Sequence, residues 1–247
     1  MNRQMGISLS EVLISLLLAS IMMTLLIQLY LNSKNQYIAA EKILSVGFDL
    51  QWVSDLMSDS FRRAGFTPCL GIDQLLVVDR RSNLEPIHAL QIENQPHQLI
   101  QVNRMNEHFT KIIKIESATE ILVENPVVLQ RKRPIMIADC AHAEVHSLFS
   151  VARQANGSLI TLDKPLYFSY DKSAYLGEYL AERWFIRKNA KGNNTLHYQS
   201  IQTEEVSPLI HSLHIKNQRV HNKQFLEIML GLDEGKTQKL MVAVRGP

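Results

Sequence analysis

The sequence has only two cysteines, Cys69 and Cys140, and neither belongs to a CxxC pair. A zinc or redox site built on paired thiols therefore has no support, although a single disulfide is possible. The chain also lacks a glycine-rich phosphate loop and a GxSxG nucleophile motif. Its 26 Lys and Arg residues nearly balance its 24 Asp and Glu residues. The one-sided basic charge of a dedicated nucleic-acid-binding protein is therefore missing.

Proline is absent from residues 7–63, and Gly47 is the only glycine there. This stretch therefore predicts one continuous helix of about 85 Å, at a rise of about 1.5 Å per residue. Residues 12–31 are apolar apart from hydroxyl and amide side chains, and a helix of this length spans a bilayer core of about 30 Å. A cleaved signal peptide fits less well, because its apolar run is only about 7–15 residues long. The nearest small-residue site, Ala39-Ala40, also lies beyond the end of this run.

A short hydrophilic leader, MNRQMG, precedes the apolar run and ends at Gly6. It is followed by ISLSE, whose last residue is Glu11. This arrangement resembles the amino terminus of type IV pilins and of their pseudopilin relatives. In that family a membrane-embedded prepilin peptidase cuts after the glycine and methylates the new amino terminus. The resemblance implies cleavage between Gly6 and Ile7 and N-methylation of Ile7, a position at which the family usually has phenylalanine.

Glu11 lies at the mouth of the apolar run, where a carboxylate in hydrocarbon costs about 2.5–3.5 kcal/mol and needs a partner. The α-amine of Ile7 stays cationic after methylation and lies four residues away, on the same helix face. Neutralisation within one chain is therefore one reading. The family resemblance implies another, in which Glu11 meets the amine of a neighbouring subunit and sets the axial register of a filament. By the same resemblance, the chain docks beneath another subunit rather than at the extreme tip.

Beyond the apolar run at 12–31, the hydrophobic pattern of the sequence changes twice. Residues 32–64 continue the helix with an amphipathic pattern, and we expect its apolar stripe to face the core. The stripe consists of Ile43, Val46, Leu50, Val53, Met57 and Phe61. After Gly65 the sequence breaks into short β-type runs separated by turns. The predicted strands are 75–79, 87–92, 98–104, 111–115, 120–124, 134–139, 144–151, 158–163, 179–188, 195–200, 208–215, 224–232 and 238–245.

Three turn signals predict which strands pair. The segment DEGK at 233–236 joins two alternating runs into a hairpin, and residues 191–194 join the strands at 179–188 and 195–200. Asn156-Gly157 marks a third turn. Such short connections imply antiparallel pairing. The expected fold is therefore α+β and pilin-like, with a long N-terminal helix packed against one or two antiparallel sheets.

Three further stretches narrow the resemblance to the PilW-type minor pilins. They are FRRAGFTPC at 61–69, ADCAHAEVHSLF at 138–149 and KLMVAVRG at 239–246. The alternative is a J-type minor pseudopilin of a type II secretion system, which shares the first of these stretches. Either family implies a leader at 1–6, a transmembrane helix half at 7–31, an amphipathic half at 32–64 and a β-rich domain at 65–247.

The PilW resemblance implies a non-enzymatic subunit without cofactors that helps to initiate or cap a type IV pilus. Its expected partners are other minor pilins, the major pilin, the prepilin peptidase, the inner-membrane assembly machinery and, before assembly, membrane lipid. Its expected location is the inner membrane, with a periplasmic globular domain, and then the pilus near its tip. A periplasm is oxidising, so a Cys69–Cys140 disulfide is expected there.

Other candidate sites have weaker signals. His142, Glu144 and His146 form an HxExH motif, which lacks the helical spacing of a zinc protease, so we expect surface or partly buried histidines and no metal. His211, His214 and His221 are weaker still. An anchored periplasmic enzyme remains an alternative, although nothing in the sequence arranges Ser, His and Asp as a triad.

Direct DNA contact is a further alternative, through three basic runs. Short charge runs are usually solvated, and no aromatic residues alternate with these, so nucleic acid is not the expected partner. The runs are Arg62-Arg63, Arg80-Arg81 and Arg131-Lys132-Arg133.

Overall fold

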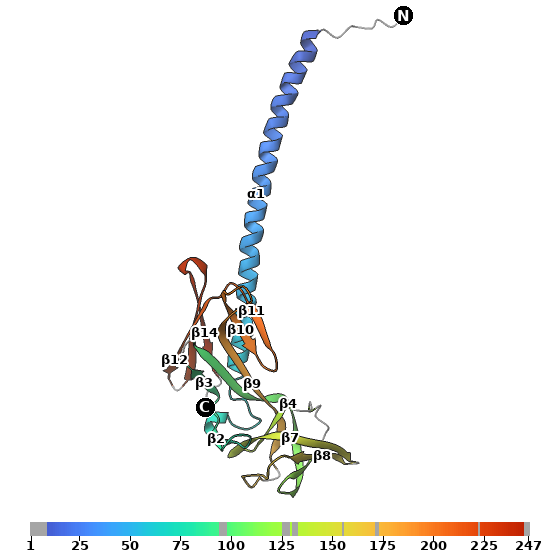
Figure 1. Cartoon of the computed structure of the whole chain (residues 1–247), viewed down its shortest axis with the longest axis vertical. Helices are drawn as coiled ribbons and strands as arrows, with labels where there is room; N and C mark the ends of the chain where they lie inside the picture. Colours follow the sequence, from blue (N-terminus) through green and yellow to red (C-terminus); the bar gives the residue numbers. More distant parts are fainter. Residues whose placement is uncertain are drawn as a thin grey trace, which may run out of the picture. The chain divides into compact units, whose positions relative to one another are not determined.

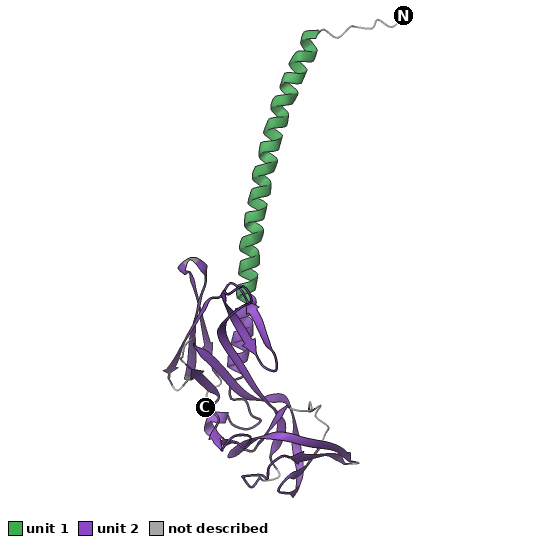
Figure 2. Cartoon of the chain, viewed as in Figure 1, with its two compact units in different colours: residues 1–51 green, residues 52–247 purple. Residues whose placement is uncertain are grey.

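The computed structural model describes residues 9–93, 98–124, 129, 133–154, 156–170, 173–221 and 223–244. Its first element is α1, Leu9–Arg62, a helix of 54 residues that runs without interruption, as the absence of proline predicts (Figure 1). The chain divides into two compact units, residues 1–51 and 52–247 (Figure 2). The last turns of α1 therefore belong to the same unit as the strands.

Within its described residues the second unit contains fourteen strands and two short 3-10 helices, η1 (Ile72–Gln74) and η2 (Asp233–Gly235). The strands are β1 Leu76–Asp79, β2 Glu85–Pro86, β3 Leu90–Glu93, β4 Leu99–Ser117, β5 Glu120–Val123, β6 Pro134–Ala138, β7 His142–Gln154, β8 Gly157–Leu162, β9 Tyr175–Lys188, β10 Asn194–Gln199, β11 Thr203–Ser207, β12 Ser212–Val220, β13 Lys223–Gly231 and β14 Thr237–Ala243. They form an eleven-stranded sheet and a separate three-stranded sheet. The chain is therefore α+β, with one long apolar N-terminal helix and a large, mostly antiparallel sheet.

Six strands of the large sheet pair in a closed ring, in the order β4, β5, β8, β7, β6, β9 and back to β4. A closed ring leaves none of these six strands with an unpaired edge along the ring. Buried aliphatic side chains of the ring strands form one core cluster. Its members include Ile112, Ile121, Val123, Ile135, Ile137, Ile160, Leu162 and Leu176. Closure explains how short strands rich in isoleucine and valine bury their apolar faces.

The long strands β4 and β9 extend beyond the ring. Their continuations pair with each other, while β10 adds to β9, β11 adds to β10 and β3 adds to β4. The expectation of purely antiparallel pairing is wrong for β1, which pairs with β7 in parallel, with Leu76 opposite His142. Sixty-odd residues separate these two strands in the chain, so no short hairpin dictates an antiparallel pairing.

The three-stranded sheet, β12-β13-β14, confirms the predicted hairpin at 224–232 and 238–245. η2 occupies the predicted turn, with Gly235 at a φ of 71°. Alternate residues of β13 are buried, namely Leu226, Ile228 and Leu230, each at 0% exposure. The β9-β10 hairpin is confirmed as well, and the Asn189 side chain accepts hydrogen bonds from two backbone amides of its turn.

The last turns of α1 carry the core-facing end of the predicted stripe. Val53, Met57 and Phe61 are completely buried, and the Phe61 ring lies 6.3 Å from that of Trp184 on β9. From the other sheet, Gln238 of β14 donates a 3.0 Å hydrogen bond to the Ser54 hydroxyl. The prediction is wrong for Ile43, which is 72% exposed. An apolar stripe indicates a face that can pack, but it does not say how far along the helix the packing partner extends.

Candidate functional site

The first half of α1 is the most unusual surface of the chain. The helix is long and apolar enough to cross a membrane, and none of its most apolar window is buried in the protein. Its leucines are correspondingly exposed, for example Leu16 at 63% and Leu26 at 66%. Exposed apolar surface of this extent indicates contact with lipid or with another protein. A membrane anchor and a signal sequence both satisfy these observations.

Three hydroxyl side chains within this apolar surface bond to their own helix. Ser15 donates to the Glu11 carbonyl at 2.5 Å, Ser20 to a carbonyl three residues back, and Thr24 to the Ser20 carbonyl at 2.8 Å. Each hydroxyl therefore has an acceptor that does not depend on water. The run can enter hydrocarbon without leaving these groups unsatisfied.

Glu11 lies in the first turn of α1. Its carboxylate is at the positive end of the helix dipole, which favours a negative charge. Gly6 and Ile7, the predicted cleavage and methylation residues, lie outside the described residues. The structure therefore places the predicted glutamate in the first described turn of the apolar helix, next to the predicted cleavage site in sequence.

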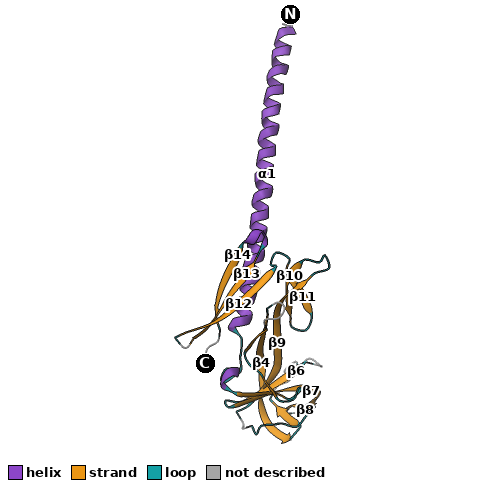
Figure 3. Cartoon of the chain, turned by 60° about the vertical axis from the view of Figure 1, so that its left-hand side comes forward, coloured by secondary structure: helices purple, strands orange, loops and turns teal. Residues whose placement is uncertain are grey.

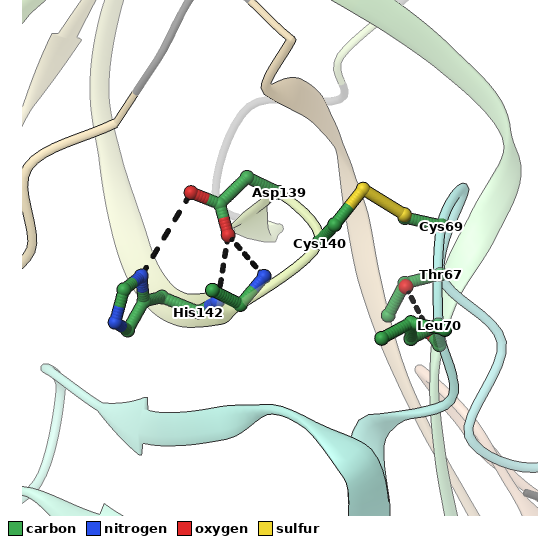
Figure 4. The surroundings of a disulfide bond; sticks show 7 residues. Thr67, Cys69, Leu70, Asp139, Cys140 and His142 are labelled. Carbon is green, nitrogen blue, oxygen red and sulfur yellow. Dashed lines mark hydrogen bonds and ion pairs between the residues drawn. A yellow bond between two sulfur atoms is a disulfide. The ribbon is translucent and has the colours of Figure 1, made fainter.

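The two cysteines lie together in the second unit, with Sγ atoms 1.97 Å and Cα atoms 5.2 Å apart, as a disulfide (Figure 4). Cys69 follows the end of α1, and Cys140 lies in the turn between β6 and β7. The Asp139 carboxylate shapes that turn, accepting hydrogen bonds from the backbone amides of Ala141 and His142 at 2.7 and 2.6 Å. The bridge therefore ties the segment after the helix to a turn on the strand ring, across 71 residues of sequence.

A buried polar network joins α1 to the large sheet. One carboxylate oxygen of Glu182 on β9, Oε1, accepts two hydrogen bonds from the Arg104 guanidinium on β4, at 2.7 and 3.0 Å. Its other oxygen accepts from the Ser60 hydroxyl at 2.5 Å, and Ser60 accepts from the indole N–H of Trp184 at 3.2 Å. All the polar atoms named here are satisfied, so the network fixes the helix end on the sheet.

The HxExH motif does not gather its three side chains. Glu144 and His146 are completely buried and bond to each other at 2.8 Å, which corrects the expectation of surface or partly buried histidines at His146. His142 instead stacks on Phe168 and lies 3.8 Å from Asp139. Burial, together with the charge of Glu144, raises the pKa of Tyr170. Among the residues that the structure describes, no group of three or more His, Cys, Asp or Glu side chains could hold a metal ion.

The basic runs are distributed over different contacts. Arg63 forms ion pairs with Asp59 and, at 3.6 Å, with Glu107. Arg80 lies over the Tyr167 ring, 5.6 Å from its centre. Arg131 and Lys132 lie outside the described residues. The third member of that run, Arg133, lines a cleft beside β9, and Arg81 and Arg183 line the same cleft.

That cleft was not predicted from the sequence. Its three arginines come from distant segments, and no local pattern links them. Comparisons of the chain with protein-family models, with curated proteins and with solved structures find no match.

Proposed function

We propose that this chain is a minor pilin of the PilW type, which helps to initiate or cap a type IV pilus. The observation that carries the proposal is the continuous helix α1, whose apolar first half is exposed and begins with Glu11 in its first turn. The leader that ends at Gly6 supports the same function. In this account the prepilin peptidase removes residues 1–6 and methylates Ile7.

In this function the apolar helix moves from the membrane into the pilus fibre. The apolar half of α1 holds the precursor in the inner membrane as a single span, with the second unit in the periplasm. Cleavage gives each subunit a cationic terminus close to its own Glu11. Pairing Glu11 with the terminus of the next subunit offsets the cost of both charges in a low-dielectric environment and fixes one axial register. This chain therefore docks beneath another subunit.

The remaining features fit a structural subunit. The disulfide between Cys69 and Cys140 suits an oxidising compartment such as the periplasm. The long helix and the sheet-rich unit provide packing surfaces, and the partners are the other minor pilins and the major pilin. The protein is then a substrate of the prepilin peptidase and not an enzyme itself.

The experiment compares two variants of the full chain in cells that assemble pili. Glu11→Gln keeps the shape of the side chain and removes its charge, whereas the control, Glu41→Gln, makes the same change at an exposed position of α1 outside the apolar run. We expect both variants in the membrane fraction and only Glu41→Gln in sheared pili. Normal incorporation of Glu11→Gln would overturn the proposal. Incorporation into a secretion pseudopilus instead would assign the chain to the J-type pseudopilins.

A further inference from the structure

The strand β9 changes partners along one of its edges. β6 pairs with it from Tyr175 to Glu178, and β10 pairs with it from Arg183 to Lys188. The two partner strands lie toward opposite ends of β9 (Figure 3). Between them, residues 179–182 pair only with β4 among the described strands. Among the residues that the structure describes, no strand therefore pairs with this edge of β9 over residues 179–182, and we call this gap the notch.

A cleft of about 270 Å³ lies at the notch. Its walls include the start of β6, at Pro134, and the end of β10, at Gln199, as well as β9 itself. Pockets for small molecules usually measure about 300–1,000 Å³, so this cleft is small for a cofactor or a metabolite. Its size and its open strand edge suit a short extended segment of polypeptide.

Three arginines line the cleft, namely Arg81, Arg133 and Arg183. Arg81 lies 5.0 Å from the centre of the Tyr179 ring. Burial raises the pKa of Tyr179 to about 12, against the opposing charges of Arg81 and Arg183. Because Arg81 lies over the Tyr179 ring, it is on the face of β9 to which Tyr179 and Arg183 point by alternation.

The charges of the three arginines are only partly balanced. Arg81 pairs with Asp79 at 2.7 Å and Arg133 with Glu178 at 2.9 Å. Arg183 donates instead to a neutral acceptor, the side-chain oxygen of Gln101, at 2.7 Å. Three cations and two paired carboxylates leave a net charge of +1 in these contacts. In addition, the Nε atom of Arg133 is buried without a hydrogen-bond partner in the described structure.

We propose that the notch binds a short, extended, acidic segment of a partner polypeptide. The segment adds to the open edge of β9 at residues 179–182 and places a carboxylate against Arg183 and Arg81. A strand that alternates apolar and acidic residues fits best, because its carboxylates then all lie on the face that carries these arginines. The inference rests on the second unit alone and does not depend on the proposed pilus function.

The test measures binding of a fluorescent peptide to the full chain in nonionic detergent, by fluorescence anisotropy. The probe is a capped pentapeptide that alternates valine and glutamate. One comparison peptide carries glutamine in place of glutamate, and another carries N-methylated backbone amides. The matched variants are Arg183→Gln and Arg187→Gln, two exposed positions of β9 of which only Arg183 lines the cleft.

We expect saturable binding of the glutamate peptide that weakens as salt is added. Arg183→Gln should weaken it about tenfold, equivalent to about 1.4 kcal/mol, while Arg187→Gln should leave it unchanged. Both comparison peptides should bind the wild-type chain no more tightly than the glutamate peptide binds the Arg183→Gln variant.

Absence of binding of the glutamate peptide would overturn the proposal, and so would any of three other outcomes. The first is equal binding of the glutamate and glutamine peptides. The second is equal binding of the N-methylated peptide, which would exclude strand addition. The third is preferential, Arg183-dependent binding of a single-stranded oligonucleotide, which would assign the cleft to nucleic acid. Because Arg183 forms no ion pair with a carboxylate in the contacts above, its variant should fold, and an unchanged far-UV circular dichroism spectrum verifies this.

Discussion

Replacing Glu182 with glutamine removes the negative charge at the centre of the network that holds the end of α1. The side chains of Arg104 and Glu182 are only 11% and 6% exposed. Water therefore cannot solvate the Arg104 guanidinium once its counter-charge is removed. Removing one partner of a buried ion pair costs about 3–5 kcal/mol. Because the glutamine oxygen can still accept one hydrogen bond, we expect the lower value, about 3 kcal/mol, or about 6–12 °C in Tm for a unit of this size.

The assay is urea unfolding of the full chain in detergent, followed by the fluorescence of Trp184, which is completely buried beside the network. A Trp52→Phe background removes the signal of the other tryptophan, which is 53% exposed. The buried ion pair also determines the order of stabilities that we expect in a double-mutant cycle. Glu182→Met combined with Arg104→Met should be less destabilising than Glu182→Met alone, because the double variant buries no unpaired charge. A loss below about 1 kcal/mol for Glu182→Gln, or a double variant that is the least stable of all, would refute the argument.

Three further predictions concern the second unit. Replacing both Cys69 and Cys140 with alanine should lower stability by about 4 kcal/mol, from the entropy of a 71-residue loop, and an unchanged thermal midpoint would contradict this. Phe61→Ala should cost about 3–5 kcal/mol in urea unfolding, because the ring is completely buried, and a loss below about 1 kcal/mol would show that the site collapses without a cavity. Burial raises the pKa of Asp79, but hydrogen bonds and charge from Arg81 outweigh it and hold that pKa below its ordinary value. The contribution of Asp79 to stability is therefore present above the unfolded pKa of about 4 and lost as the pH falls through the folded pKa. In urea unfolding, the free energy of unfolding of Asp79→Asn should be lower than that of the wild type at pH 7, and the two values should converge below about pH 4.

The helix and most strands could be predicted from local pattern, whereas the limits of several strands could not. β4 was predicted as two strands, 98–104 and 111–115, because the segment between them is polar. In the structure the strand continues through a shift in register between Met105 and Phe109, opposite β9. β11 was missed because its five residues are mostly polar and exposed, which is typical of an edge strand but also of a loop.

The closed ring of strands and the arginine cleft depend on contacts between distant segments. Alternation predicts which face of a strand is apolar, but it does not predict that β6 lies between β7 and β9. Likewise, Arg81, Arg133 and Arg183 belong to three separate segments, and they meet at one cleft only in the folded chain. Charge counting over the whole chain, which is nearly neutral, could not reveal this local excess.

We propose that the chain is a processed filament subunit, and mass spectrometry of its amino terminus is the decisive experiment. The full chain should be purified from cells that contain the prepilin peptidase. We expect a mature chain that begins at Ile7 with a methylated α-amine. A mature chain that retains residues 1–6, or that begins beyond the apolar run, would contradict it.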